Sequence, residues 1–145
     1  MDKDCSGAVL IVDDEPTMAA ILQHALRRSG YQAQVVQSAA EALTTLDKEA
    51  WDLLVIDYGL PDMNGDHLAK VARARGYRGP IVMFTGNCFA RKPEVVDMLV
   101  FKPVEWDVFR KVVASLLART EADVSQEMAR GSEVGEPVLG GTEAC

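Results

Sequence analysis

The sequence has few of the features that mark secreted, membrane or disulfide-stabilised proteins. Its three cysteines, Cys5, Cys88 and Cys145, are scattered and form no CxxC pair. An odd number of isolated cysteines predicts reduced thiols rather than a disulfide framework. No apolar run approaches the length of a membrane span, and the first residues lack the basic-then-apolar pattern of a signal peptide. We therefore expect a cytoplasmic protein with no membrane partner.

Basic charge is also scarce. The formal net charge of −7 argues against nucleic acid as a direct partner. From Glu121 onward six acidic residues face one base, Arg130, so this segment alone carries −5. It also has no sustained periodicity, which favours a disordered tail or a linker. We predict an N-terminal lead over residues 1–7, a folded domain over 8–120 and an acidic, disordered tail over 121–145.

Strand and helix patterns alternate along the folded domain. Short apolar runs rich in β-branched residues predict five strands, at residues 8–12, 32–37, 53–57, 81–84 and 98–101. Amphipathic helices are predicted after Pro16, after the capping-box pattern of Ser38 and Glu41, near Asn64, and over 104–120. This rhythm predicts an α/β fold with a doubly wound, five-stranded parallel sheet and helices on both faces.

One interval breaks the rhythm. Residues 86–97 should hold a helix, but Pro93 interrupts the segment. Either Pro93 begins a very short helix or the segment is largely loop. We expect a truncated or irregular fourth helix.

Polar side chains of different kinds follow four of the predicted strands. Asp13 and Asp14 follow the first, Asp57 ends the third, Thr85 follows the fourth and Lys102 the fifth. The carboxyl ends of parallel strands are where ligands bind in such sheets. Carboxylates a few ångströms apart repel by roughly 4 kcal/mol per pair at an effective dielectric near 20, and a Mg²⁺ ion would offset this. The ammonium group of Lys102 and the hydroxyl of Thr85 can each bind a phosphate oxygen. The set of residues therefore predicts phosphoryl transfer onto Asp57.

Four motifs in this order resemble the receiver domain of bacterial two-component response regulators. They are Val12-Asp-Asp-Glu15, Asp57-x-x-Leu-Pro-Asp-Met-Asn-Gly65, Phe84-Thr-Gly86 and Phe101-Lys-Pro103. The resemblance covers about residues 8–119 and implies the CheY-like, flavodoxin-like (βα)5 fold. It also implies a phospho-accepting signalling domain rather than an enzyme with a separate substrate.

The resemblance implies roles for the residues at the strand ends. Asp57 would accept a phosphoryl group from a histidine of a sensor kinase or phosphotransfer protein. Asp14, Asp57 and the backbone carbonyl of Gly59 would hold Mg²⁺, with Asp13 acting mostly through water. Thr85 and Lys102 would contact the phosphoryl group. The Lys102-Pro103 peptide bond would be cis, as in the family.

The chain departs from the family pattern at positions that concern output. The aromatic residue that commonly lies three positions before the lysine is Leu99 here, and Pro93 shortens the fourth helix. We therefore do not expect the threonine–aromatic switch of the family to operate unchanged. Gly59 and Gly86 are small where side chains often flank the phosphoryl group, which predicts freer access of water and a shorter-lived phosphate.

Several functions stay open. The main interpretation is a phosphorylatable module that signals through an unknown downstream protein, either stand-alone or cut from a larger regulator or hybrid kinase, with homodimerisation undecided. Because few residues follow Thr120, we expect no DNA-binding or catalytic output domain. A phosphohydrolase is disfavoured because Gly59 stands where such enzymes place a second acid. The remaining alternative is a phosphorylation-independent adaptor that keeps the receiver fold.

Overall fold

The computed structural model describes residues 7–87 and 90–118 of the chain. Its elements follow in the order β1 (Ala8–Val12), α1 (Pro16–Arg28), β2 (Gln32–Val36), α2 (Ala39–Lys48), β3 (Leu53–Asp57), α3 (Gly65–Ala74), β4 (Ile81–Thr85), β5 (Met98–Phe101) and α4 (Trp106–Leu117). The strands form one parallel sheet in the order β2-β1-β3-β4-β5. This confirms the predicted α/β fold and its doubly wound sheet.

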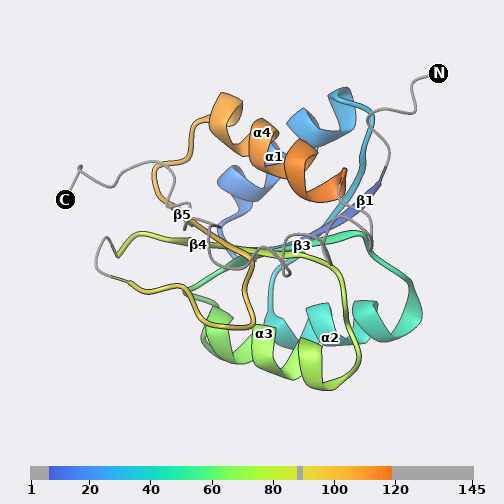
Figure 1. The fold of residues 1–145 in the computed structure, drawn as a ribbon, viewed down its shortest axis with the longest axis vertical. Coiled ribbons are helices and arrows are strands. Elements are labelled where there is room, and N and C mark those ends of the chain that lie inside the picture. Colours follow the sequence, from blue (N-terminus) through green and yellow to red (C-terminus); the bar gives the residue numbers. More distant parts are fainter. Residues whose placement is uncertain (1–6, 88–89, 119–145) are drawn as a thin grey trace, which may run out of the picture.

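Helices cover both faces of the sheet, with α1 and α4 on one side and α2 and α3 on the other (Figure 1). The central strands β1, β3 and β4 are buried on both faces, so successive residues enter different cores. In β3, Val55 packs in the core under α1 and α4, whereas Leu54 and Ile56 pack in the core under α2 and α3. An edge-to-face contact between Phe84 and Phe109, with ring centroids 5.3 Å apart, holds α4 on the sheet.

The helix boundaries follow the local signals in the sequence. The helix start that the capping-box pattern predicted is confirmed, because Ser38 Oγ accepts a hydrogen bond from the Glu41 amide at 3.2 Å. The Glu41 carboxylate, however, accepts the amide of Gln37 at 2.9 Å rather than that of Ser38. Pro16 opens α1 as predicted, and Gly30 follows that helix with a φ of +100°, a conformation that favours glycine. Asn64 occupies the N-cap position of α3, although its side chain makes no capping hydrogen bond.

The connection from β4 to β5 has no helix in its described residues, 86–87 and 90–97. The amide of Val96 donates to the carbonyl of Pro93 at 3.1 Å, so the proline lies in a turn. This confirms the truncated crossover and favours the loop over the short helix.

Arg73 from α3 holds this crossover in place. Its guanidinium donates to the carbonyl of Val95 at 3.1 Å and pairs with the Asp97 carboxylate at 3.0 Å. The same Asp97 oxygen accepts the amide of Ile81 at 2.8 Å. One charged cluster therefore ties the end of α3 to the starts of β4 and β5.

The predicted helix over 104–120 is observed as α4, which ends at Leu117. The three cysteines and residues 119–145 lie outside the described residues, so the domain boundaries at 1–7, 8–120 and 121–145 stay predictions. Within the part of the chain that the structure describes, no helix combines the length and apolar character needed to cross a membrane.

Candidate functional site

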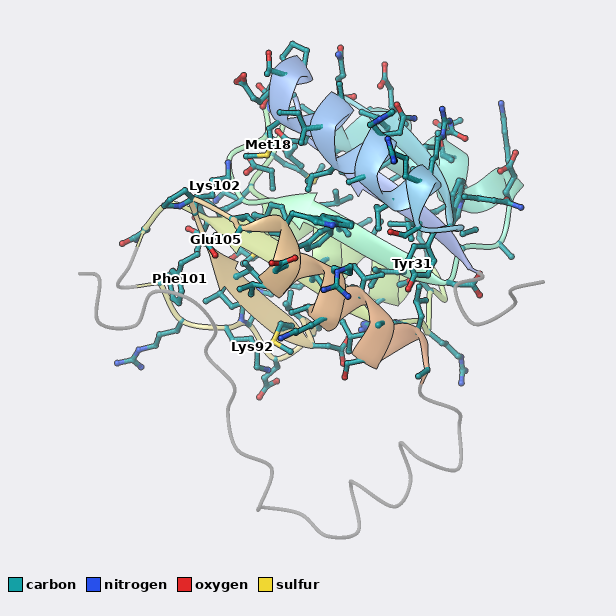
Figure 2. All side chains as sticks on the ribbon, turned by 90° about the horizontal axis from the view of Figure 1, so that it is seen from above. Met18, Tyr31, Lys92, Phe101, Lys102 and Glu105 are labelled. Atoms are coloured by element: carbon teal, nitrogen blue, oxygen red, sulfur yellow. The ribbon has the colours of Figure 1, made fainter. Side chains whose placement is uncertain are left out.

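The predicted site residues meet at one end of the sheet. Asp57 is the last residue of β3 and Thr85 the last of β4. Lys102 directly follows β5, and its amide donates to the Thr85 carbonyl at 2.8 Å. Figure 2 shows Lys102 at this end of the domain and Tyr31 at the opposite end. The parallel sheet therefore brings together side chains that are far apart in the sequence.

Three carboxylates form a cluster at this end. Asp13, Asp14 and Asp57 each offer one oxygen, and these oxygens lie within 4.8 Å of one another. Asp13 is 2% exposed and Asp57 is 7% exposed, whereas Asp14 faces the solvent. The cluster is therefore exposed to solvent at Asp14 and buried at Asp13 and Asp57, so an ion could reach it from solvent.

The two oxygens of Asp13 differ in their surroundings. Oδ1 accepts the amide of Glu15 at 2.9 Å, whereas Oδ2 is buried and has no hydrogen-bond partner among the described residues. Burial raises the pKa of Asp13, and the nearby charge of Asp57 adds to this effect, while the bond from Glu15 opposes it. A buried acceptor without a partner costs about 1–3 kcal/mol. A hard cation with oxygen ligands such as Mg²⁺ would satisfy this atom, so the residues present fit that ion.

Asp57 has a donor on each carboxylate oxygen. Lys102 Nζ lies 2.5 Å from Oδ1, and the Gly59 amide donates to Oδ2 at 3.2 Å. The side chain of Lys102 is 32% exposed, so its ammonium group faces both the carboxylate and the solvent. A flexible cation in this position can bind an anionic group that arrives from solvent.

Thr85 is 3% exposed, and its hydroxyl oxygen accepts the amide of Asn87 at 3.0 Å. A hydroxyl that accepts one hydrogen bond can still donate its own proton. The turn after β4 therefore fixes the oxygen of Thr85 beside the tips of β3 and β5 and leaves it able to donate.

Position 99 is a buried leucine, as the sequence predicted, and it packs in the core under α2 and α3. The aromatic residue on the same face of β5 is Phe101, which is the Cα partner of Thr85 in the sheet. Figure 2 places Phe101 and Lys102 at the same end of the domain. Sequence reasoning missed this neighbour of Thr85, although the two-residue period of a strand places Leu99 and Phe101 on one face.

The loop after Asp57 makes a contact that the sequence did not predict. Both oxygens of Asp62 accept hydrogen bonds from the start of α2, from the Ala39 amide at 2.9 Å and the Ala40 amide at 3.0 Å. These bonds lower the pKa of Asp62. No local signal predicts the pair, because the partners lie more than twenty residues earlier in the chain.

Glycines surround Asp57 for two different reasons. A Cβ at Gly65 would lie 2.6 Å from the Asp57 carbonyl, so the close approach of α3 to β3 requires glycine. A Cβ at Gly59 would lie 3.8 Å from Asp57 Oδ2, and one at Gly86 would meet nothing within 4 Å. The Asp57 carboxylate is therefore flanked by space that a side chain at position 59 would occupy.

Comparisons with known proteins agree with this geometry. The family model of the response regulator receiver domain matches residues 9–114. The chain is 32% identical over 118 residues to the sensor histidine kinase RcsC of Salmonella typhimurium, and the alignment covers 78% of this chain and 12% of RcsC. It is 32% identical over 143 residues to the transcriptional regulatory protein PhoP of Bacillus subtilis, and that alignment covers 91% of this chain and 58% of PhoP. The chain therefore spans less than two thirds of the length of either relative.

Solved structures give the same match. A CheY-like receiver domain from Methylobacillus flagellatus superposes with a TM-score of 0.70 at 27% identity, covering 75% of this chain and 97% of that one. TrrA from Thermotoga maritima, solved in complex with Mg(2+)-BeF, gives 0.70 at 26% identity with the same coverage. A complex of the histidine kinase ThkA with TrrA gives 0.69 at 26% identity, covering 77% and 98%.

Proposed function

The chain belongs to the response regulator receiver domain family, and we propose that Asp57 accepts a phosphoryl group from a phosphohistidine in a Mg²⁺-dependent reaction. One observation carries the proposal. The Asp57 carboxylate pairs with Lys102 at 2.5 Å and belongs to a cluster of three aspartates. In that cluster, a buried oxygen of Asp13 has no hydrogen-bond partner among the described residues. This combination suits an anionic ligand bound together with a divalent cation.

Asp13, Asp14, Asp57 and the backbone carbonyl of Gly59 would hold the Mg²⁺ ion. When bound, the ion supplies positive charge that stabilises the phosphoryl oxygens during transfer. All of these ligands are oxygens, the type that Mg²⁺ prefers. Burial raises the pKa of Asp13, and a bound cation would offset this effect by stabilising the ionised carboxylate.

The side chains of this site would share the work of transfer. An oxygen of Asp57 attacks phosphorus, a P–O bond forms, and the P–N bond of the phosphohistidine breaks, leaving an imidazole. Lys102 exchanges its partner from the carboxylate to a phosphoryl oxygen, and the Thr85 hydroxyl donates to another. The chain thus contributes positioning and electrostatic stabilisation, which are the main requirements of phosphoryl transfer.

The proposed donor is a sensor histidine kinase or a histidine phosphotransfer protein, and the receiver of the signal is a downstream protein. Two comparisons support the donor. TrrA, a structural neighbour of this chain, was solved in complex with a histidine kinase, and RcsC is itself named a sensor histidine kinase.

Reductive trapping tests which residue is modified. The chain is incubated with acetyl phosphate and Mg²⁺, treated with borohydride and digested. An aspartyl phosphate at position 57 is reduced to homoserine, so the peptide that contains Asp57 should lose about 14 Da. Reduction at another carboxylate would contradict the assignment. A folded chain with no reduced peptide would instead favour the phosphorylation-independent adaptor.

A further inference from the structure

We propose that Asp62 is a positioning residue that holds the two sides of the proposed metal site together by tying the loop after β3 to the start of α2. The inference rests on the proposed function, because it concerns how the Gly59 carbonyl is placed relative to the acids of β1. Asp62 itself would contact neither the cation nor the phosphoryl group.

The contact with α2 uses the whole carboxylate. Oδ1 accepts the amide of Ala39 at 2.9 Å, and Oδ2 accepts the amide of Ala40 at 3.0 Å. These amides are the first two of the helix and have no partner within it. The positive end of the helix dipole also attracts the carboxylate. The exposed side chain of Asp62 is therefore held by the helix in one orientation.

The other end of the connection is the loop that carries Gly59. Gly59 and Asn64 form an isolated antiparallel bridge, and the Tyr58 carbonyl accepts the amides of Leu60 at 3.2 Å and Gly65 at 2.7 Å. Residues 59–64 are therefore a closed turn with Asp62 inside it. A turn closed at its base moves largely as one piece, so the anchor at Asp62 restrains the Gly59 carbonyl.

The start of α2 is in turn linked to the acids of β1. The Asp13 amide donates to the carbonyl of Val36, the last residue of β2, at 3.0 Å. Only two residues separate Val36 from Ala39, the first residue of α2. The path from Asp13 through Val36 and Ala39 to Asp62 and Gly59 therefore links the two sides of the proposed metal site. The two hydrogen bonds of Asp62 are the part of this path that a single side chain controls.

Ser38 provides a matched control. It caps the same helix by accepting the Glu41 amide at 3.2 Å, but it precedes α2 directly and, within the described part of the chain, makes no side-chain hydrogen bond to the loop. Ser38→Ala and Asp62→Ala should therefore both weaken the start of α2, whereas only Asp62→Ala releases the loop. Asp66→Asn removes an equal charge from the first turn of α3 and controls for the change in net charge.

Cation affinity is measured directly by titrating the full chain with Mn²⁺ and counting free ion by electron paramagnetic resonance, with urea unfolding of each variant alongside. Orienting partners of a metal site typically change its affinity by 10–100-fold. We expect Asp62→Ala to raise the Mn²⁺ dissociation constant about tenfold, at the lower end of that range, because Asp62 acts through the backbone. Ser38→Ala and Asp66→Asn should stay close to wild type, and Asp62→Asn, which keeps an acceptor oxygen, should fall between.

Three outcomes would overturn the inference, and they can be told apart. Equal dissociation constants for Asp62→Ala and wild type would make Asp62 a helix cap only. An equal loss in Asp66→Asn would assign the effect to charge. A wild-type chain that binds no Mn²⁺ would overturn the proposed metal site itself, and with it this role of Asp62.

Discussion

The ammonium nitrogen of Lys102 lies 2.5 Å from Oδ1 of Asp57, although 45 positions separate the two residues in the sequence. The parallel sheet creates this pair by ending β3 and β5 at the same edge. Lys102 also reaches solvent, so the pair can open to admit an anion between its members. The geometry therefore places the ammonium group of Lys102 where an anionic group would approach Asp57.

Replacing this lysine should slow phosphorylation. We expect Lys102→Met to lower the rate with acetyl phosphate about a hundredfold, the effect of losing one preorganised donor to developing charge. The rate is measured by rapid-quench mass spectrometry. Lys111→Met in α4 serves as the control for the loss of one positive charge. A Lys102→Met variant that reacts as fast as wild type would show that the ammonium group does not assist transfer.

The open space at position 59 should shorten the life of the aspartyl phosphate. A Cβ there would lie 3.8 Å from Asp57 Oδ2, so a larger side chain would cover the acceptor without a clash at its base. We expect Gly59→Leu to lengthen the half-life of the phosphorylated chain several-fold and Gly59→Ala to have a smaller effect. The decay is followed by intact mass after acetyl phosphate is removed. Decay of both variants at the wild-type rate would mean that water does not enter from this side.

The buried carboxylate of Asp13 should make the metal-free fold less stable as pH rises. Its pKa in the folded state is raised above the ordinary value of 3.8, so the folded chain holds this proton over a pH range in which the unfolded chain has lost it. Stability then falls as pH increases through that range, from the unfolded value of 3.8 up to the raised folded value. We expect Asp13→Asn in EDTA to be more stable than wild type at pH 7.

This difference should shrink as the pH is lowered to about 4, because the folded chain then gains a proton at the Asp13 carboxyl. Urea unfolding at both pH values measures it, and adding Mg²⁺ at pH 7 should stabilise wild type more than the variant. A gap that is the same at both pH values would show that ionisation of Asp13 does not cause it.

The Arg73 cluster should stabilise the crossover between β4 and β5. Arg73 is partly buried and donates to three backbone carbonyls besides its bond with Asp97. We expect Arg73→Ala to lower the free energy of unfolding by about 2 kcal/mol, as for hydrogen bonds to a charged group. Arg75→Ala is the control, because its pair with Asp47 is exposed and should contribute at most about 0.5 kcal/mol. Equal losses in urea unfolding would contradict a special role for Arg73.

The sequence predicted the features that depend on neighbours along the chain. Strands such as residues 53–57, the cap at Ser38 and the truncated crossover at Pro93 are confirmed. The cis Lys102-Pro103 bond, which the family resemblance implied, is also observed. Asp13, Asp57 and Lys102 could be placed together because parallel strands share an edge. Their chemical roles stay predictions.

The features that the sequence did not predict join residues that no local pattern relates. From the sequence alone, Asp62 is an acidic loop residue, and its contact with α2 depends on how the loop and helix pack. Arg73 is a basic residue of a helix, and its bonds depend on the path of the β4–β5 crossover. The position of Phe101 beside Thr85 depends on the register of β4 and β5. Such contacts are set by packing between elements, which composition and periodicity do not encode.

The measurement that tests the central claim most directly is intact-mass spectrometry after incubation with acetyl phosphate, with and without Mg²⁺, on wild type and Asp57→Asn. The account predicts one phosphoryl adduct, about 80 Da, on wild type with Mg²⁺ and none on the variant or in EDTA. An adduct of equal yield on Asp57→Asn would contradict the assignment of the acceptor. No adduct on wild type even after rapid quenching would contradict phosphoryl transfer at this site and favour the adaptor.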